Sequence, residues 1–253
     1  MIPEIVKLVL SEFAYLIIRN DAMRYEFIKN DGEPNVNGFL SKLLPNLVYY
    51  RKCRREEIRR ILEEDFMRAD AEKVYECVNT VIDQVYFSDA ELEILEEKIW
   101  FRPPKKNRAV FDEIEDSEAK LAGQSTSVYI RNLLNEYARL PQYKRERLLF
   151  DEELYDFARA CETGRIFHTS VDGQSIRMFA FHYVYEYTYH QENWLIGYDL
   201  TNKEIKSFPL YKARNAYVVE KKYVPSADLI DAMQKYYEDQ KFGDVIPYEE
   251  EIC

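Results

Sequence analysis

The fold of this chain is decided in residues 177–211, which read RMFAFHYVYEYTYHQENWLIGYDLTNKEIKSFPLY. Between residues 179 and 189, aromatic side chains occupy every second position. This spacing is the two-residue period of a β-strand and differs from the period of about 3.6 residues in a helix. Polar residues 190–193 interrupt the pattern, residues 194–198 resume it, and residues 204–210 follow a second polar turn. The sequence therefore predicts an antiparallel β-meander.

Several motifs in and around this meander resemble the WYL domain. They are an arginine near the start of the first strand, NWLIGYD at 193–199, IKSFPL at 205–210 and the basic YKAR at 211–214. The resemblance covers residues 160–222 and implies a small Sm-like, SH3-type β-barrel that binds nucleic acid or a nucleotide-like ligand. The signature itself departs from the family, because Asn193 stands at the family's tryptophan and Trp194 at its tyrosine, and only Leu195 matches.

The same resemblance implies a ligand groove in the barrel. Arg177 and Lys212 match the family pattern, although Lys212 replaces an arginine and lacks the bidentate fork that suits phosphate. Arg214 lies two positions further on and points the same way along a strand. The residues expected at the groove are Arg177, His182, Trp194, Tyr198, Lys212 and Arg214. The alternative is that the tyrosine and histidine side chains only pack in a half-buried barrel, which we expect for residues 183–189.

Length and composition describe a folded protein with room for two or three small domains. The 253 residues are 47% hydrophobic and 32% charged, and the net charge is −11. This charge argues against a whole-surface attraction to nucleic acid or to an anionic membrane, so a polyanion site must be a local basic patch. Residues 1–18 are apolar but interrupted by charges, which predicts an amphipathic helix and neither a signal peptide nor a membrane span.

Catalytic and metal-binding motifs are missing from the sequence. The 4 cysteines are scattered, the 3 histidines form no H-x-x-x-H pair, and there are only 7 glycines. No phosphate loop, nucleophile elbow or H-E-x-x-H motif occurs. We therefore expect a non-catalytic protein without a metal site, cofactor or disulfide framework, in a reducing cytoplasm.

Residues 35–44 (NVNGFLSKLL) and 125–134 (STSVYIRNLL) look like two copies of one unit, 90 positions apart. Helix-capping residues match capping residues, and the apolar positions that follow match as well. The offset continues into residues 54–58 and 144–148, which predicts a second helix in each copy. A strand is expected before each copy, at 24–29 and at 98–102, and residues 103–122 form a longer loop in the second copy.

A strand followed by two helices, twice over, resembles the ribbon-helix-helix unit over residues 22–155. In that family two chains each lend one strand to a ribbon that enters the DNA major groove. We hypothesise an intramolecular pseudo-dimer in which the strands at 24–29 and 98–102 pair antiparallel. The outer face of this ribbon would carry Lys98, Trp100 and Arg102, which suit stacking and phosphate binding. The alternative is a structural or partner-binding ribbon.

Two basic clusters lie near the expected start of the second helix of each copy. They contain Arg54 and Arg55 in the first copy, and Lys144 and Arg145 in the second. Backbone N–H groups and positive charge together favour phosphate at such a position. Alternatively, each basic residue faces an adjacent glutamate along a solvated helix face.

Together these patterns predict an α+β protein in three segments. Residues 1–155 form a helical, ribbon-helix-helix-like domain, residues 156–223 form the WYL-like β-barrel, and residues 224–253 form a C-terminal helix and an acidic tail. Between the two copies, residues 59–97 have the pattern of two acidic amphipathic helices.

Three functions fit these predictions. The order of the elements resembles the small WYL accessory proteins of type VI-D CRISPR systems, which implies a non-catalytic protein that binds single-stranded RNA and modulates an RNA-guided ribonuclease. The alternatives are a ligand-responsive transcription regulator that binds operator DNA, and an adaptor that binds only protein. The expected partners are single-stranded RNA or DNA, a CRISPR effector protein, and a second copy of this chain through the helix at 227–240.

Overall fold

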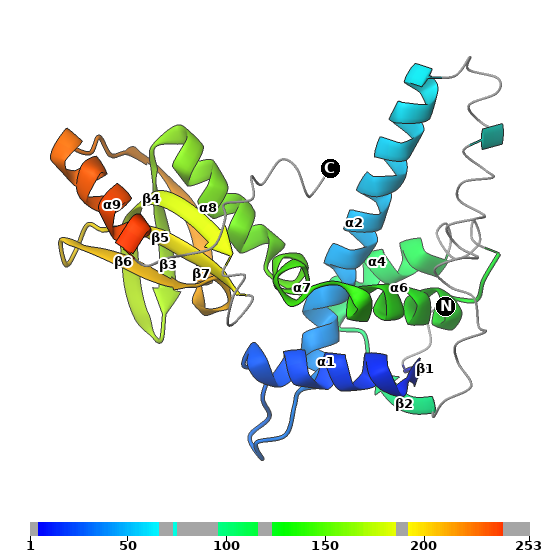
Figure 1. Ribbon diagram of the computed structural model, residues 1–253. Coiled ribbons are helices and arrows are strands. Elements are labelled where there is room, and N and C mark those ends of the chain that lie inside the picture. The colour runs from blue at the N-terminus through cyan, green and yellow to red at the C-terminus, as the bar shows by residue number, and fades with distance from the viewer. Residues whose placement is uncertain (1–4, 66–72, 75–95, 116–122, 186–191, 240–253) are drawn as a thin grey trace. The chain divides into compact units, whose positions relative to one another are not determined.

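The computed structural model describes residues 5–65, 73–74, 96–115, 123–185 and 192–239. The chain divides into two compact units, one ending at Leu140 and the other beginning at Pro141 (Figure 1). Both units combine helices with antiparallel strands, which confirms the predicted α+β class. Among the helices in these ranges, none has a stretch apolar and long enough to span a membrane.

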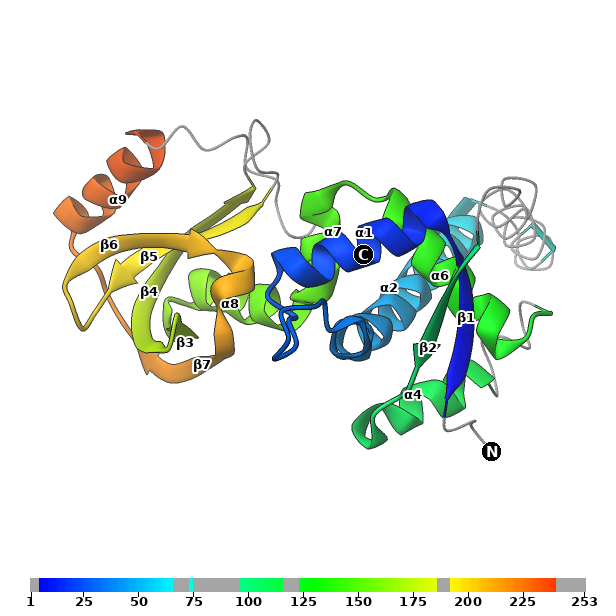
Figure 2. The same ribbon diagram turned by 90° about the horizontal axis from the view of Figure 1, so that it is seen from below.

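The first unit contains a two-stranded antiparallel ribbon, whose strands run side by side in Figure 2. Its strands are β1 (Val6–Ser11) and β2 (Glu96–Phe101), with Leu8 opposite Ile99. One face of the ribbon is buried, because Leu8, Ile99 and Phe101 point into the core. The helical elements of this unit are α1 (Glu12–Arg24), α2 (Val36–Asp65), η2 (Lys105–Asn107), α4 (Arg108–Glu113) and α6 (Thr126–Arg139).

The hypothesised pairing of residues 24–29 with residues 98–102 is wrong, because β2 pairs within the chain with β1 instead. The predicted strand at 24–29 does not form: Arg24 ends α1, Glu26 takes a positive φ of 64°, and Ile28 makes only an isolated bridge. The helix predicted over residues 1–18 is also wrong in its first part, because residues 6–11 are β1. The strand pattern of Val6, Leu8 and Leu10 was not recognised, because the neighbouring apolar residues also fit a helical period.

The repeat predicts where two helices begin but not how they continue. Helices α2 and α6 start 90 positions apart, and the capping side chains of Asn35 and Ser125 accept hydrogen bonds from backbone N–H groups (2.9 and 3.4 Å). Helix α2 then continues through Pro45 to Asp65, whereas the second copy breaks and α7 (Gln142–Leu149) belongs to the second unit. The predicted second helix of the first copy is therefore wrong. The loop predicted at 103–122 contains η2 and α4.

The second unit is built on a five-stranded antiparallel sheet in the order β6-β5-β4-β3-β7. Its strands are β3 (Arg165–Val171), β4 (Gln174–Tyr185), β5 (Asn193–Asp199), β6 (Glu204–Pro209) and β7 (Arg214–Lys222). The predicted meander is confirmed as β4, β5 and β6. The predicted closed barrel is wrong, because within the described residues β6 and β7 stay at opposite edges of an open sheet.

Helices cover both faces of this sheet, which buries its apolar side chains without closure (Figure 1). On one face, Phe157 of α8 (Asp151–Thr163) packs edge-on against Phe167, with the two ring centres 5.0 Å apart. On the other face, Tyr237 of α9 (Ala227–Asp239) packs against His182, with the two ring centres 5.1 Å apart. Both helices agree with the sequence: α8 stops before Gly164 in the left-handed conformation, and α9 is the predicted C-terminal helix. Most of the two acidic helices predicted within 59–97 lies outside the described residues.

Candidate nucleic-acid interface

Exposed positive charge without acidic neighbours in sequence marks the basic segment, which we define as residues 98–108 (KIWFRPPKKNR). It has 5 cationic and no acidic side chains in a chain of net charge −11. All these cations are exposed, and none forms an ion pair with the residues that the structure describes. They are Lys98, Arg102, Lys105, Lys106 and Arg108. Because uncompensated positive charge attracts polyanions, this segment is the leading candidate for a nucleic-acid interface.

Helix α2 anchors the basic segment through polar contacts. Pro45 has no N–H, so the carbonyl of Ser41 one turn earlier loses its helical hydrogen bond. The side-chain amide of Asn107, the last residue of η2, donates to that carbonyl instead. Beside it, the Arg102 backbone N–H donates to the side-chain oxygen of Asn37 at 2.8 Å. A proline that would be expected to weaken α2 thus creates a docking point for the segment.

Apolar and ionic contacts complete the anchoring. The rings of Phe101 and Phe111 lie 5.5 Å apart, and both side chains are fully buried. An ion pair joins Lys52 of α2 to Glu113 at the end of α4. The backbone from β2 to α4 is therefore held at several points while its cations extend into solvent.

The outer face of the ribbon carries an exposed indole. Trp100 is 65% exposed and lies directly opposite Lys7, whose Nζ is 5.7 Å from the centre of the indole ring. Lys98 is on the same face, two residues before Trp100. The prediction that Lys98, Trp100 and Arg102 are outward-facing is confirmed by their exposure.

Of the two other predicted basic clusters, the first does not lie at a helix start, and the second does. Arg54 lies in the middle of α2, where it donates to the Tyr50 hydroxyl at 3.2 Å, and Arg55 follows it in the same helix. Lys144 and Arg145 do lie in the first turn of α7, but Arg145 is only 8% exposed. The reason for the difference is that α2 is continuous, so Arg54 and Arg55 have no helix terminus beside them.

On the sheet of the second unit, Arg177 belongs to what we call the sheet-face cluster: His168, Ser175, Arg177 and Tyr217. Arg177 is exposed and pairs across strands with His168. The His168 ring stacks on Tyr217 at 4.6 Å, and its Nε2 shares a hydrogen bond with the Ser175 hydroxyl at 3.0 Å. This cluster combines an aromatic pair with a cation on one open face.

The other predicted groove residues do not join Arg177. Lys212 forms an ion pair with Asp172 at 2.9 Å, and the guanidinium of Arg214 lies 5.6 Å from the Phe150 ring centre. His182 packs under α9, and burial lowers its pKa. Two further groove residues, Trp194 and Tyr198, are half-buried in β5, Tyr198 stacked on Tyr223. The structure thus distributes these side chains between packing and ion pairs.

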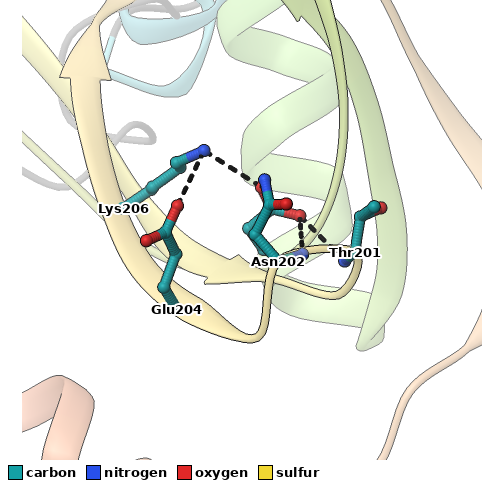
Figure 3. Close-up of polar contacts among 5 residues, drawn as sticks. Thr201, Asn202, Glu204 and Lys206 are labelled. Carbon is teal, nitrogen blue, oxygen red and sulfur yellow. Dashed lines mark hydrogen bonds and ion pairs between the residues drawn. The ribbon is translucent and has the colours of Figure 1, made fainter.

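Two carboxylates in the second unit each accept several hydrogen bonds that hold neighbouring elements together. Asp199 holds the β5–β6 turn (Figure 3): it accepts from the Thr201 N–H at 2.8 Å and from Lys206 at 3.2 Å, and Lys206 also pairs with Glu204. Burial alone would raise the pKa of Asp199, but the hydrogen bonds from Thr201, Lys206 and Asn202 lower it.

The second carboxylate, Glu146 of α7, is fully buried. Its Oε2 accepts from the backbone N–H and the side-chain amide of Asn193, both at 2.7 Å, and its Oε1 accepts from the Tyr211 N–H at 3.3 Å. Arg147 donates to Asn193 Oδ1 at 2.7 Å. Burial raises the pKa of Glu146 to about 8. Asn193 is therefore a structural link between α7 and β5.

Two observations on the described residues concern metal binding and cysteine reactivity. It contains no group of three or more His, Cys, Asp or Glu side chains that could hold a metal ion. Burial raises the pKa of the Cys161 thiol to about 12, so this cysteine is a poor nucleophile.

Some residues of the candidate interface were missed by the sequence analysis. Lys7 was assigned to a helix, and its place beside Trp100 depends on strand pairing that only the structure reveals. Lys105, Lys106 and Arg108 were assigned to a loop, although their position directly after Arg102 was a visible signal. His168 and Tyr217 come from strands far apart in the sequence.

The fold is similar to that of a solved structure described as a CRISPR Cas-related protein. The TM-score is 0.66 at 17% sequence identity, and the match covers 96% of this chain and 73% of the other. At this identity the likeness shows a shared fold. No protein-family model matches the chain, and no curated protein matches its sequence. The WYL and ribbon-helix-helix assignments stay predictions.

Proposed function

We propose that this chain is a non-catalytic accessory protein of a CRISPR system, which binds single-stranded RNA and modulates an RNA-guided ribonuclease. The observation that carries the proposal is the basic segment, with its exposed and anchored cations and its exposed Trp100. The similarity in fold to a CRISPR Cas-related protein supports the biological setting.

Single-stranded RNA fits this surface better than duplex DNA does. Elsewhere the chain is acidic, so a ligand gains electrostatic attraction only where it follows the basic segment. An exposed indole adds stacking energy with any unpaired base, whereas the bases of a duplex are stacked on one another. A flexible single strand can satisfy both conditions.

The test is RNA binding in a salt series. A variant with Lys98, Arg102, Lys105 and Lys106 all changed to Gln should bind a single-stranded RNA at least about tenfold more weakly, a loss of about 1.4 kcal/mol. The slope of log K against log salt should become shallower by about 0.7 for each phosphate that the variant no longer neutralises. Fluorescence anisotropy measures both quantities.

A matched control removes the same charge elsewhere. Changing the exposed Lys203, Lys221, Lys222 and Lys235 to Gln should leave the affinity and the slope nearly unchanged. When each variant is added to an RNA-guided ribonuclease, the basic-segment variant should change the rate of RNA cleavage less than the wild type does. The control variant should change it as much as the wild type does. Equal losses of RNA affinity in both variants would contradict the proposal, because they would mean that only net charge matters.

A ligand-responsive regulator is the second candidate function, and the sheet-face cluster favours it. There the stacked His168 and Tyr217 would bind an aromatic ligand and Arg177 an anionic group. Arg177→Ala would then abolish ligand binding while RNA binding through the basic segment stays intact.

A further inference from the structure

We infer that Trp100 is a stacking platform for one unpaired base, and that the cations on both sides of it bind the adjoining phosphates of the same strand. This inference rests on the proposed function and names the form of nucleic acid that the basic segment binds. It begins from the exposure of Trp100, because a large aromatic side chain that is 65% exposed has no packing role that explains it.

The immediate surroundings of Trp100 are suited to a base. Lys7, directly across the ribbon, places its Nζ 5.7 Å from the ring centre and so covers one face of the indole. The high exposure of the side chain leaves the opposite face for a ligand. A base stacked there would be held by a π-surface that does not distinguish one base from another.

The position of the cations indicates the path of the strand. Lys7 and Lys98 share the outer face of the ribbon with Trp100, and Arg102, Lys105, Lys106 and Arg108 follow it along the chain. Charge therefore lies on both sides of the stacking residue. This arrangement of a base platform between phosphate-binding side chains is typical of sequence-tolerant single-strand binding.

The strand that carries Trp100 is anchored on both sides of this residue, which favours stacking. Its neighbours Ile99 and Phe101 are buried, and Arg102 is fixed through its backbone N–H to Asn37. The indole is thus presented by an ordered strand, so little conformational entropy is lost when a base binds.

The experiment measures tryptophan fluorescence together with affinity. The chain has 2 tryptophans, Trp100 and Trp194, so Trp194→Phe leaves Trp100 as the only indole reporter. Oligoadenylate should quench this emission and protect it from acrylamide, whereas an abasic oligomer of equal length and charge should do neither. If Trp194→Phe does not fold, the acrylamide protection is read in the wild-type protein.

The affinity measurements give the second arm. Trp100→Ala should weaken oligoadenylate binding about tenfold and leave binding of the abasic oligomer unchanged, and Trp100→Phe should restore most of the affinity. If the wild type binds oligoadenylate without quenching, and Trp100→Ala binds it equally well, the stacking inference is wrong while the proposed function stands. If the wild type binds neither oligomer, the proposed function fails and the inference fails with it. That result is expected if the basic segment binds an acidic protein and no nucleic acid.

Discussion

Glu146 shows how one buried side chain can make the second unit sensitive to pH. Its folded-state pKa is raised to about 8 by burial, against about 4.3 for an unfolded glutamate. Between these values the folded state holds a proton that the unfolded state has released. Stability from this group is therefore complete below about pH 4.3 and is lost as the pH rises through 8.

This loss of stability with rising pH should be smaller in Glu146→Gln, a substitution that keeps the shape of the side chain and removes its charge. From pH 6 to pH 9, the midpoint of thermal unfolding should fall less in this variant than in the wild type, because only the wild type must ionise a buried carboxyl group. The exposed Glu238→Gln serves as the control and should follow the wild type. A wild type that gains stability over Glu146→Gln at pH 9 would mean that the N–H donors of Asn193 and Tyr211 outweigh burial.

Individual residues were predictable where a short pattern determines them. The outward direction of Lys98, Trp100 and Arg102 follows from strand alternation alone. The partners of a residue were not predictable in this way, because Lys7 reaches Trp100 only through long-range pairing. The link between Asn107 and Ser41 depends on Pro45 remaining inside a helix, which propensity argues against.

Among the secondary-structure elements, the β4–β5 pair contains the closest backbone approach that a side chain would disturb. A Cβ on Gly197 would lie 2.4 Å from the carbonyl oxygen of Phe179 and 2.8 Å from Met178 Cε. The neighbouring pairs also contain a bulge between Ala180 and His182. Only glycine lets the two strands approach this closely.

We therefore expect Gly197→Ala to destabilise the protein by about 1–3 kcal/mol, the typical cost of overpacking a core. Chemical denaturation followed by the fluorescence of Trp194 measures the effect, since that residue lies in the same strand. Gln174→Ala, at the exposed start of β4, should change stability by less than about 0.5 kcal/mol. Equal stability of Gly197→Ala and wild type would contradict the close approach described for these strands.

The elements also show the limit of periodic patterns. The meander and the last helix have strong periods and were predicted with nearly correct bounds. The first strand was misplaced because residues 24–29 alternate over too short a window, in a segment where a helix ends and the chain turns. Sheet closure was not predictable, since it depends on whether helices cover the faces of the sheet.

At the scale of the whole molecule, the chain combines an acidic composition with a few local clusters of cations. A net charge of −11 weakens non-specific attraction to RNA, so binding should be confined to the basic segment. From the sequence alone, any polyanion site was expected to be a local basic patch. Which of several basic clusters it is depends on burial and on ion pairs, which distinguish the exposed basic segment from Arg145 and Lys212.

The most direct test of this account is a map of where RNA touches the protein. A single-stranded RNA containing 4-thiouridine is cross-linked to the full chain by light, and a protease that cuts after glutamate releases the peptide of residues 98–113. We predict that the cross-linked nucleotides are found mainly on this peptide, with Trp100 among the modified residues. Cross-links confined to peptides that carry His168, Arg177 or Tyr217 would contradict the central claim and assign RNA binding to the sheet-face cluster.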